Sequence, residues 1–420
     1  MRRTPTVSVC VLLAASAVVS ANWPSWRGPS GNGVSTETNL PVRWGPAENI
    51  AWKLALPQWS GATPIIWGDT IFLNVAEADL DTLSLWAVGR RNGQVLWKRP
   101  LSSGNRKQRK QNMSSPSPVT DGATVWATTG TGFIRAFDFT GREVWMRELQ
   151  KDYGRFGLNW GYANSPLLLE GDLVVPVLHG MRTDDPSYIL RIDGKTGRTK
   201  WKAERPNTAI RESPDAYITP ALATVGGRSE IVITGADVVT GHDPATGREL
   251  WRADGLNPQN DPAYRIVASP VTHGDIVIAP TRERPLLVLK AGGRGDVTTS
   301  HRLWHFNNGP DVPTPVTDGK YLYVITDRGV VYCLELETGR TVYGPQRLTP
   351  GTYSSSPVLA DGKIYIASED GVFSVFRAGP SFELLATNDM DDYTLSSVAI
   401  KDGQLFLRTA GWLWAVGGQN

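Results

Sequence analysis

Short runs in which apolar and polar residues alternate recur along the whole chain, and tight turns separate them. Two clear examples are 321–325 (YLYVI) and 363–367 (KIYIA). Alternation with a period of two is typical of half-buried β-strands. No long segment carries apolar residues at helical spacing, so the pattern predicts an all-β protein.

These strands and turns belong to a repeat that opens with a small hydroxyl residue followed by proline. An apolar pair, a turn with Asp-Gly or Gly-Asp and an alternating strand come next. Repeats with periods above about 40 residues and several strands each are typical of propeller blades. Eight copies occur at intervals of 41 to 54 residues, and valine replaces proline in the last: Thr63-Pro64, Ser117-Pro118, Ser165-Pro166, Thr219-Pro220, Ser269-Pro270, Thr314-Pro315, Ser356-Pro357 and Ser397-Val398.

A second signature closes each unit and reads Ala/Gly-x-Asp-x-x-Thr-Gly-x-x-x-Trp. It is clear at 241–251 and 191–201, and looser at 87–97, 136–145 and 333–343. The glycines of the Asp-Gly and Thr-Gly turns supply the positive φ that tight hairpins need. Each unit therefore gives about four antiparallel strands.

One such unit is a blade that cannot bury both faces alone, so it must pack against neighbours in a ring. The eighth unit begins at Ser397 and lacks a final Trp strand, and residues 49–54 resemble that missing strand. We therefore expect an eight-bladed β-propeller of four-stranded antiparallel blades, closed by N- and C-terminal strands in one blade. A β-helix or a sandwich has similar strand content but fits the long period less well.

The N-terminus has the layout of a secretory signal peptide. Arg2 and Arg3 precede an apolar run from Val7 to Val19, and small residues favour a cut after Ala21. The run is too short to span a bilayer well, although a buried strand is an alternative interpretation. The predicted organisation is a signal peptide at 1–21, an N-terminal extension at 22–45 and the propeller at 46–420, in a periplasmic or secreted protein.

Charge and cysteine content narrow the class further. The chain has 43 basic and 41 acidic residues, and removal of Arg2 and Arg3 leaves equal numbers. That balance argues against a nucleic-acid binder, which needs a basic face. Cys10 lies in the predicted signal, so Cys333 has no partner for an intramolecular disulfide. No later apolar stretch is long enough for a membrane span, and we expect a soluble monomer.

The Asp-x-x-Thr-Gly-x-x-x-Trp units resemble the pyrroloquinoline-quinone (PQQ) repeat, which quinoprotein alcohol dehydrogenases share with BamB-like outer-membrane assembly proteins. The opening at 23–35 (WPSWRGPSGNGVS) resembles that of exported quinone-binding-like propellers. The resemblance covers nearly the whole chain after the predicted signal. It implies the fold and leaves the activity open, because one fold hosts many functions.

The resemblance also implies a role for the repeated tryptophans. In that family the indole docks on a turn of the neighbouring blade, which assigns a structural role to Trp52, Trp97, Trp145, Trp201, Trp251 and Trp304. Neither the dehydrogenases nor the BamB-like proteins resemble this sequence in every feature. The dehydrogenases are longer and carry an adjacent Cys-Cys ring beside a calcium-bound quinone, and the BamB branch carries a lipid-anchoring cysteine motif. Both cysteine features are missing here.

A search for catalytic motifs finds none. His301 and His305 have i,i+4 spacing, but they flank a strand and no glutamate follows the first histidine. No nucleophile elbow, phosphate loop or dinucleotide fingerprint is present. The acidic residues Asp389, Asp391 and Asp392 suit a solvated loop better than a calcium site. We therefore predict no metal site.

The loops that lead into the Ser/Thr-Pro strands should gather at one mouth of the central channel. Aromatic and hydrogen-bonding side chains around a concavity suit a flat or sugar-like ligand or a peptide, although they can also simply fill the funnel. The predicted ligand-binding residues are Trp59, Asn159, Trp160, Arg211, Tyr264, Arg265, Asn308, Tyr353 and Asp392.

These observations predict an exported, non-catalytic propeller that binds a periplasmic or envelope protein, or a small ligand, at one face. The alternative is a quinoprotein oxidoreductase that uses PQQ with calcium. A polysaccharide-acting enzyme is a third interpretation. It would need paired carboxylates at the mouth, where the sequence places Asp392 alone. We predict no bound cofactor.

Overall fold

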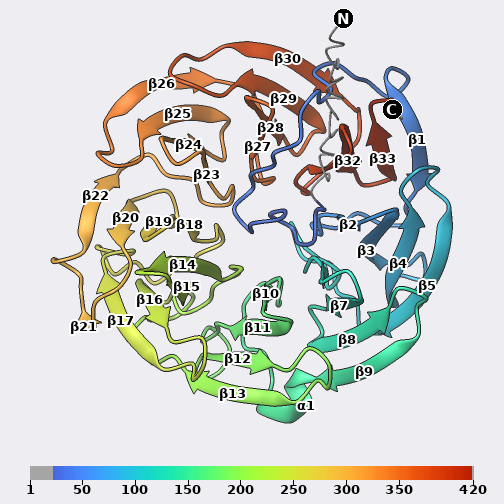
Figure 1. Cartoon of the computed structure of the whole chain (residues 1–420). Helices are drawn as coiled ribbons and strands as arrows, with labels where there is room; N and C mark the ends of the chain where they lie inside the picture. The colour runs from blue at the N-terminus through green and yellow to red at the C-terminus, as the bar shows by residue number, and fades with distance from the viewer. Residues whose placement is uncertain (1–21, 419–420) are drawn as a thin grey trace, which may run out of the picture.

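The computed structural model describes residues 22–418 and shows eight sheets arranged around a central axis, seven of four strands and one with a short fifth strand (Figure 1). The predicted eight-bladed, all-β fold is confirmed. The one helix among these residues, α1 (Leu149–Tyr153), follows the second blade. The predicted signal peptide lies outside the described residues. Within those residues, no helix is long and apolar enough to cross a membrane.

The first four blades follow one another along the chain, and their strands are antiparallel. Blade 1 holds β2 (Ile65–Trp67), β3 (Thr70–Ala76), β4 (Leu83–Gly89) and β5 (Val95–Ser102). Blade 2 holds β6 (Val119–Thr120), β7 (Thr124–Thr128), β8 (Phe133–Asp138) and β9 (Glu143–Glu148). Blade 3 holds β10 (Leu167–Leu169), β11 (Asp172–Val177), β12 (Tyr188–Ile192) and β13 (Thr199–Glu204). Blade 4 holds β14 (Ala221–Val225), β15 (Arg228–Gly235), β16 (Val238–His242) and β17 (Glu249–Asp254).

The next three blades repeat this order. Blade 5 holds β18 (Val271–His273), β19 (Ile276–Ala279), β20 (Leu286–Lys290) and β22 (Arg302–Phe306). Blade 6 holds β23 (Val316–Thr317), β24 (Tyr321–Ile325), β25 (Val330–Glu335) and β26 (Thr341–Arg347). Blade 7 holds β27 (Val358–Ala360), β28 (Lys363–Ala367), β29 (Val372–Arg377) and β30 (Leu384–Asp389).

Blade 8 joins the two ends of the described chain, as the sequence predicts. Its inner strands are β31 (Ala399–Lys401), β32 (Gln404–Arg408) and β33 (Trp412–Val416), and its outermost strand is β1 (Ile50–Ala55). β1 pairs antiparallel with β33, from Ile50 opposite Val416 to Ala55 opposite Trp412. The ring is therefore closed by backbone hydrogen bonds within one blade, which leaves no gap between the first and last blades.

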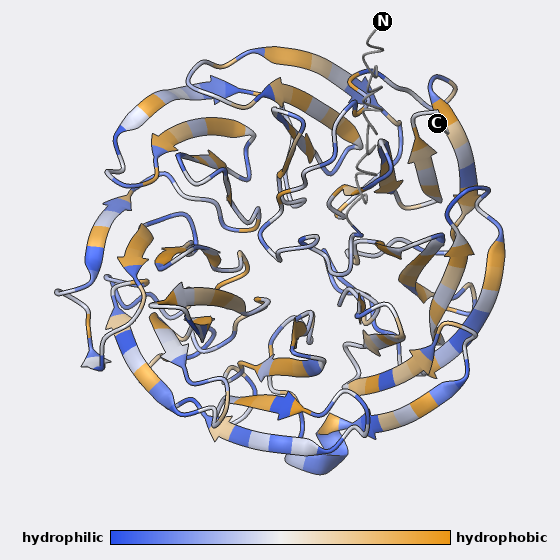
Figure 2. Cartoon of the chain, in the orientation of Figure 1, coloured by the Kyte–Doolittle hydropathy of each residue, from blue (hydrophilic) through white to orange (hydrophobic). Residues whose placement is uncertain are grey.

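The hydrophobic core lies between the blades. The second and third strands of each blade are largely buried, whereas the outermost strands carry more exposed residues. Along the outermost strands hydrophobic and hydrophilic positions alternate (Figure 2). The inward residues of each outermost strand face the next blade, and the outward ones face solvent. Each blade thus buries both of its faces only because it has two neighbours.

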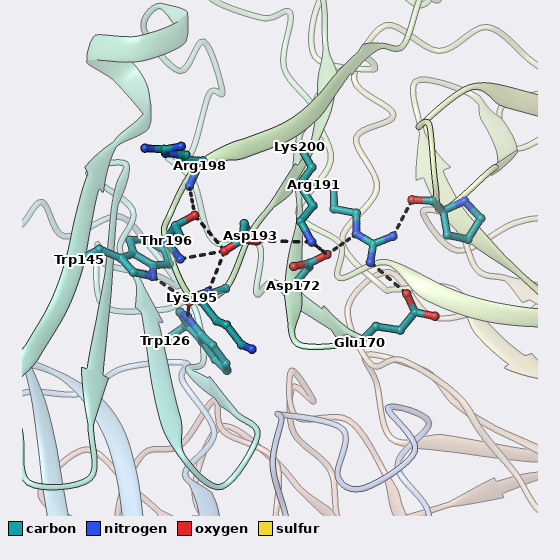
Figure 3. A network of polar contacts seen from close by, with 12 residues as sticks. Trp126, Trp145, Glu170, Asp172, Arg191, Asp193, Lys195, Thr196, Arg198 and Lys200 are labelled. Atoms are coloured by element: carbon teal, nitrogen blue, oxygen red, sulfur yellow. Dashed lines mark hydrogen bonds and ion pairs between the residues drawn. The ribbon is translucent and has the colours of Figure 1, made fainter.

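Five of the six repeated tryptophans donate their indole Nε1–H to a carbonyl of the next blade. One of these bonds ends at Gly194, whose carbonyl accepts from Trp145 at 2.8 Å and also from Trp126, a further tryptophan of the same blade, at 3.0 Å (Figure 3). An arginine continues the junction beside them, since Arg191 binds Asp172 at 2.6 Å and the carbonyl of Pro244 in blade 4 at 2.9 Å (Figure 3). The other four bonds are Trp52 to Arg90, Trp97 to Phe139, Trp201 to Pro244 and Trp304 to Leu336.

Trp251 differs from the expectation of docking on the neighbouring blade. Its Nε1 donates to Oε2 of Glu230 in its own blade at 2.7 Å, and its ring lies over Gly241. Blade 5 lacks the Thr-Gly turn, or Asn-Gly for Trp52, on which the other indoles dock. Its longer connection instead adds β21 (Gly295–Asp296) alongside β17 as a parallel fifth strand. This Gly-rich insertion at 291–296 (AGGRGD) thus replaces the turn on which Trp251 would have docked.

The glycine of each Thr-Gly turn makes room for the docking indole. At Gly247 φ is +74°, and a Cβ atom would lie 2.5 Å from the Trp201 ring. We expect Gly247→Ala to lower the free energy of unfolding by about 2–4 kcal/mol, since the left-handed backbone and the overpacking both cost energy. Gly171→Ala is the matched control: its φ is +80° with no atom within 4 Å of the added Cβ. It should cost only about 1–2 kcal/mol. Equal losses in urea unfolding would contradict the docking role.

Candidate functional site

A cavity of about 460 Å³ occupies the axis of the ring. Its wall includes the hydroxyl residue that opens the first strand of every blade: Thr63, Ser117, Ser165, Thr219, Ser269, Thr314, Ser356 and Ser397. One end of the cavity is covered by the segment before β1, which contributes Trp26 to the lining (Figure 1). The other end is surrounded by the loops that connect the blades. The cavity is thus a funnel with one closed end.

The eight hydroxyl residues form a belt that links blade to blade. The backbone N–H of one residue donates to the side-chain oxygen of the equivalent residue in the next blade. Seven of the eight junctions have this bond, at 2.9 to 3.2 Å: 63 to 117, 117 to 165, 219 to 269, 269 to 314, 314 to 356, 356 to 397 and 397 back to 63. At the remaining junction in the described chain, Asn164 donates to the carbonyl of Ala216 at 3.2 Å. The Ser/Thr of the repeat therefore holds the inner edge of the ring together.

The closed end is built by residues 23–35, which cross the axis from blades 1 and 2 to blade 7. Trp23 exchanges backbone bonds with Ile66 at 2.8 and 2.7 Å, and Thr120 donates to Pro24. On the far side, Gly33 and Ser35 pair with Leu359. The segment is anchored at both ends, so it forms a fixed floor.

Arg27 is the centre of this floor and is 2% exposed. Its guanidinium donates to the carbonyls of Pro357 at 2.7 Å, Pro315 at 2.9 Å and Asn32 at 3.0 Å. Burial lowers the pKa of Arg27 to about 9, so the side chain is still a cation at neutral pH. Since all three acceptors are neutral carbonyls, its positive charge is not cancelled by them.

Aromatic side chains line the open end next to blades 3 and 4. Trp160 is 38% exposed, and its indole Nε1 donates to Glu212 at 2.6 Å. Its backbone N–H donates to the hydroxyl of Tyr217 at 3.1 Å, and both residues line the cavity. Burial raises the pKa of Tyr217 above its usual range, so it is a neutral phenol. The indole is therefore held in place while part of it faces the opening.

An acidic group lies beside these aromatics. Arg265 binds Asp311 through both guanidinium nitrogens, at 3.1 and 3.4 Å, and Asp327 accepts the backbone N–H groups of Asp311 at 2.6 Å and Val312 at 3.1 Å. Glu283 lines the same wall. Burial, reinforced by the neighbouring Asp311, raises the pKa of Asp327 to about 6. This wall therefore carries three carboxylates, Asp311, Asp327 and Glu283, and one cation, Arg265.

The raised pKa of Asp327 gives a testable pH dependence. Its folded pKa of about 6 exceeds the usual 3.8, so the folded state holds the proton more tightly and stability decreases as pH rises from about 4 to about 6. In Asp327→Asn this contribution is absent. We expect the decrease in unfolding free energy between pH 4 and 6.5 to be smaller than in the wild type, by up to about 3 kcal/mol. Urea unfolding at several pH values measures it, and identical slopes would refute the assignment.

A basic loop faces the acidic wall from the side of blades 1 and 2. Gln108, Arg109, Lys110 and Gln111 line the cavity. Lys110 forms an ion pair with Glu369 of blade 7 at 2.6 Å, which ties the loop across the opening. The side chain of Gln111 donates to the carbonyls of Trp160 and Gly161. This loop therefore narrows the mouth and is tied both to blade 7 and to the segment before blade 3.

The structure brings only two of the nine predicted mouth residues, Trp160 and Arg265, into the cavity lining. Tyr353 is fully buried and covers Gly329, and Asp392 accepts the backbone N–H of Gly411 at 2.9 Å. The remaining five do not line the cavity, and Tyr264 lines a second pocket instead: Trp59, Asn159, Arg211, Tyr264 and Asn308.

The prediction that Asp392 is the sole carboxylate at the mouth is wrong, because Asp311, Asp327 and Glu283 line the cavity instead. These carboxylates lie in the loops before and after the strands, where the repeat pattern carries no signal. The belt positions were visible in the sequence as the Ser/Thr before each proline, but the pattern did not reveal their role. Arg27 and Trp26 gave no sequence signal beyond the opening motif.

The family model described as outer membrane protein assembly factor BamB matches the chain at 42–155, 81–342 and 293–405. Solved structures with the same fold include BamB from Moraxella catarrhalis, at 15% identity and a TM-score of 0.62, covering 88% of this chain and 97% of that one. A europium-containing methanol dehydrogenase has 12% identity and a TM-score of 0.68, covering 93% and 90%. Quinohemoprotein alcohol dehydrogenase from Comamonas testosteroni has 11% identity and a TM-score of 0.65, covering 95% and 81%. No curated protein matches the sequence.

The channel residues do not fit a PQQ-calcium site of the kind that the resemblance implies. Cys333 is buried in β25 of blade 6, where its Sγ contacts the carbonyl of Gly379 at 3.7 Å, so it provides no wall for a flat ring in the channel. Arg265 and Lys110 are already paired with carboxylates. Within residues 22–418, no group of three His, Cys, Asp or Glu side chains is placed to hold a metal ion.

Proposed function

Because the chain belongs to the BamB-like family of PQQ-repeat propellers, we propose that it is a non-catalytic binding protein that uses the open end of its channel. The observation that carries the proposal is the funnel itself. Its floor is closed by the chain's own residues 23–35, and its mouth combines an exposed indole with paired charges. Concave sites lined by aromatic side chains and a few polar groups are typical of ligand sites.

The proposed occupant is a periplasmic or envelope protein segment, or a small ligand, that inserts into the funnel. The predicted signal peptide supports export to that compartment. Trp160 supplies the contact surface, because its ring is partly exposed while Glu212 fixes its orientation. Exposed aromatic residues that are held rigidly lose little entropy on binding and often dominate the affinity.

Affinity capture from an envelope extract tests this proposal. We expect the mature protein to retain a component that Trp160→Ala loses, since truncating a central aromatic contact costs about 2 kcal/mol or more. Leu303→Ala is the matched control, because Leu303 is 44% exposed on β22 at the outer rim. Capture that is identical for all three proteins, or turnover of an alcohol in a dye-linked assay, would refute the proposal.

The quinoprotein alternative rests on the fold of the two dehydrogenases and is tested separately. We predict that the purified protein does not bind PQQ tightly, even with calcium. Each missing stacking or charge contact costs about 1–3 kcal/mol, so two losses weaken binding by about a hundredfold or more. A titration that follows quinone absorbance measures this, and saturation at low micromolar quinone would favour an oxidoreductase.

A further inference from the structure

The belt at the base of the funnel presents hydroxyl protons that no protein group uses. A serine or threonine hydroxyl has one proton and two lone pairs. In the belt one lone pair accepts the N–H of the preceding blade. Among residues 22–418, no protein acceptor is found for the protons of seven of these hydroxyls, which are all at most 6% exposed: Thr63, Ser117, Ser165, Ser269, Thr314, Ser356 and Ser397.

The floor adds further donors. Trp26 lines the cavity, and its indole N–H is buried without a partner in the described structure. The carbonyls of Pro315 and Pro357, which adjoin Thr314 and Ser356 in the belt, are turned toward Arg27 and are satisfied by it. The base of the funnel therefore offers hydrogen-bond donors in a ring, and the two belt carbonyls next to Arg27 are already used.

The charged group at the base of the funnel is a cation, which, like the hydroxyl donors, favours an anionic ligand. The guanidinium of Arg27 lies behind the belt and donates only to carbonyls. In a buried environment an unpaired charge acts at longer range than in water, because the local dielectric is low. Hydroxyl donors close to a buried cation stabilise a negative charge.

We propose that the base of the funnel binds an oxyanion group, either a carboxylate or a phosphate, carried by the ligand that enters the channel. This inference rests on the proposed function, since it assigns the chemistry of the same cavity. Asp311, Asp327 and Glu283 line the wall nearer the mouth and repel a ligand that is anionic throughout. The ligand is therefore neutral or cationic along its body and anionic at its inner end.

The matched variants are Thr314→Val and Thr314→Ser. Valine keeps the volume and removes the hydroxyl, whereas serine keeps the hydroxyl and removes a methyl group. Thr314 is 2% exposed, and its oxygen also accepts the N–H of Ser269. Thr63→Val and Thr63→Ser repeat the test across the ring, in case one valine variant does not fold. Circular dichroism of each variant checks that the propeller is intact.

Fluorine NMR of trifluoroacetate with the mature protein is the measurement. We expect line broadening with a dissociation constant on the order of millimolar, as for a fragment of few atoms. The valine variants should weaken it about tenfold, and the serine variants should not. Competition by acetate alone identifies a carboxylate site, and stronger competition by inorganic phosphate identifies a phosphate site.

Two results would overturn the oxyanion site. One is the absence of broadening at probe concentrations well above millimolar, and the other is equal affinity in the folded valine and serine variants. If Trp160→Ala still abolishes envelope capture in that case, only the base of the funnel is wrongly assigned. If the anion binds and capture is unaffected by Trp160→Ala, the proposed use of the mouth fails instead.

Discussion

Replacing Arg27 with methionine is expected to lower the free energy of unfolding by about 3–5 kcal/mol. The variant removes the donors for the carbonyls of Asn32, Pro315 and Pro357, and each buried carbonyl left without a partner costs about 1–3 kcal/mol. Methionine has a similar volume, so the loss reports hydrogen bonding more than packing. Removal of the buried positive charge is favourable in itself, because burying a charge costs free energy, and it offsets part of this loss. Urea unfolding of both proteins measures the difference.

A pair of glycine variants tests the same floor without changing the arginine. At Gly33 φ is +82°, and an added Cβ would lie 2.3 Å from the Arg27 guanidinium, so Gly33→Ala displaces it. Gly31 has a φ of +66° and no atom within 4 Å of its added Cβ. We expect Gly31→Ala to cost about 1–2 kcal/mol and Gly33→Ala clearly more. Equal losses would show that Arg27 does not hold the floor.

Removal of residues 22–56 is the second change with a large expected effect. It deletes β1 and the floor, and with them the fully or nearly fully buried Trp23, Leu40, Trp44 and Leu56 of the largest core cluster. Burial of one large apolar side chain contributes about 1.5–3 kcal/mol, and whole domains are stable by about 5–15 kcal/mol. We therefore expect the cooperative thermal transition, followed by circular dichroism, to disappear.

The missing segment supplied as a separate chain is the control for this deletion. A peptide of residues 22–56 contains β1 and should pair with the exposed edge of β33, so the transition should return at high peptide concentration. A truncated protein that unfolds cooperatively by itself, at nearly the same temperature, would show that blade 8 does not need its outermost strand.

Most of the fold was predictable because it is repeated. Eight copies of one pattern average out local exceptions, so the number of blades and the closure by residues 49–54 followed from the spacing. Trp251 is the informative exception. It matches the motif as well as Trp201 does, but docking needs a turn on the next blade, and the pattern of one unit does not encode its neighbour. The Gly-rich insertion was visible, yet its pairing with β17 depends on tertiary contacts.

The site was less predictable, for a physical reason. The mouth is made by loops, whose paths depend on single contacts such as the bonds from Asp327 to Asp311 and Val312. Trp160 and Arg265 reached the cavity, but Tyr353 turned inward to cover Gly329. No periodicity in the sequence distinguishes a loop residue that lines the cavity from one that is buried elsewhere. The floor was hidden for another reason, since residues 23–35 lie outside the repeat and contact blades far along the sequence.

The pairing of β1 with β33 also sets an order of events during synthesis. Residues 50–55 are made long before their partners at 412–416. Contacts between such distant segments are slow to form, and partly built domains expose apolar surface. Seven blades can therefore assemble in sequence while the eighth remains incomplete. The chain has to be kept from aggregating until residues 412–416 are available, and a chain interrupted before them would lack the partner of β1 and could not close the ring.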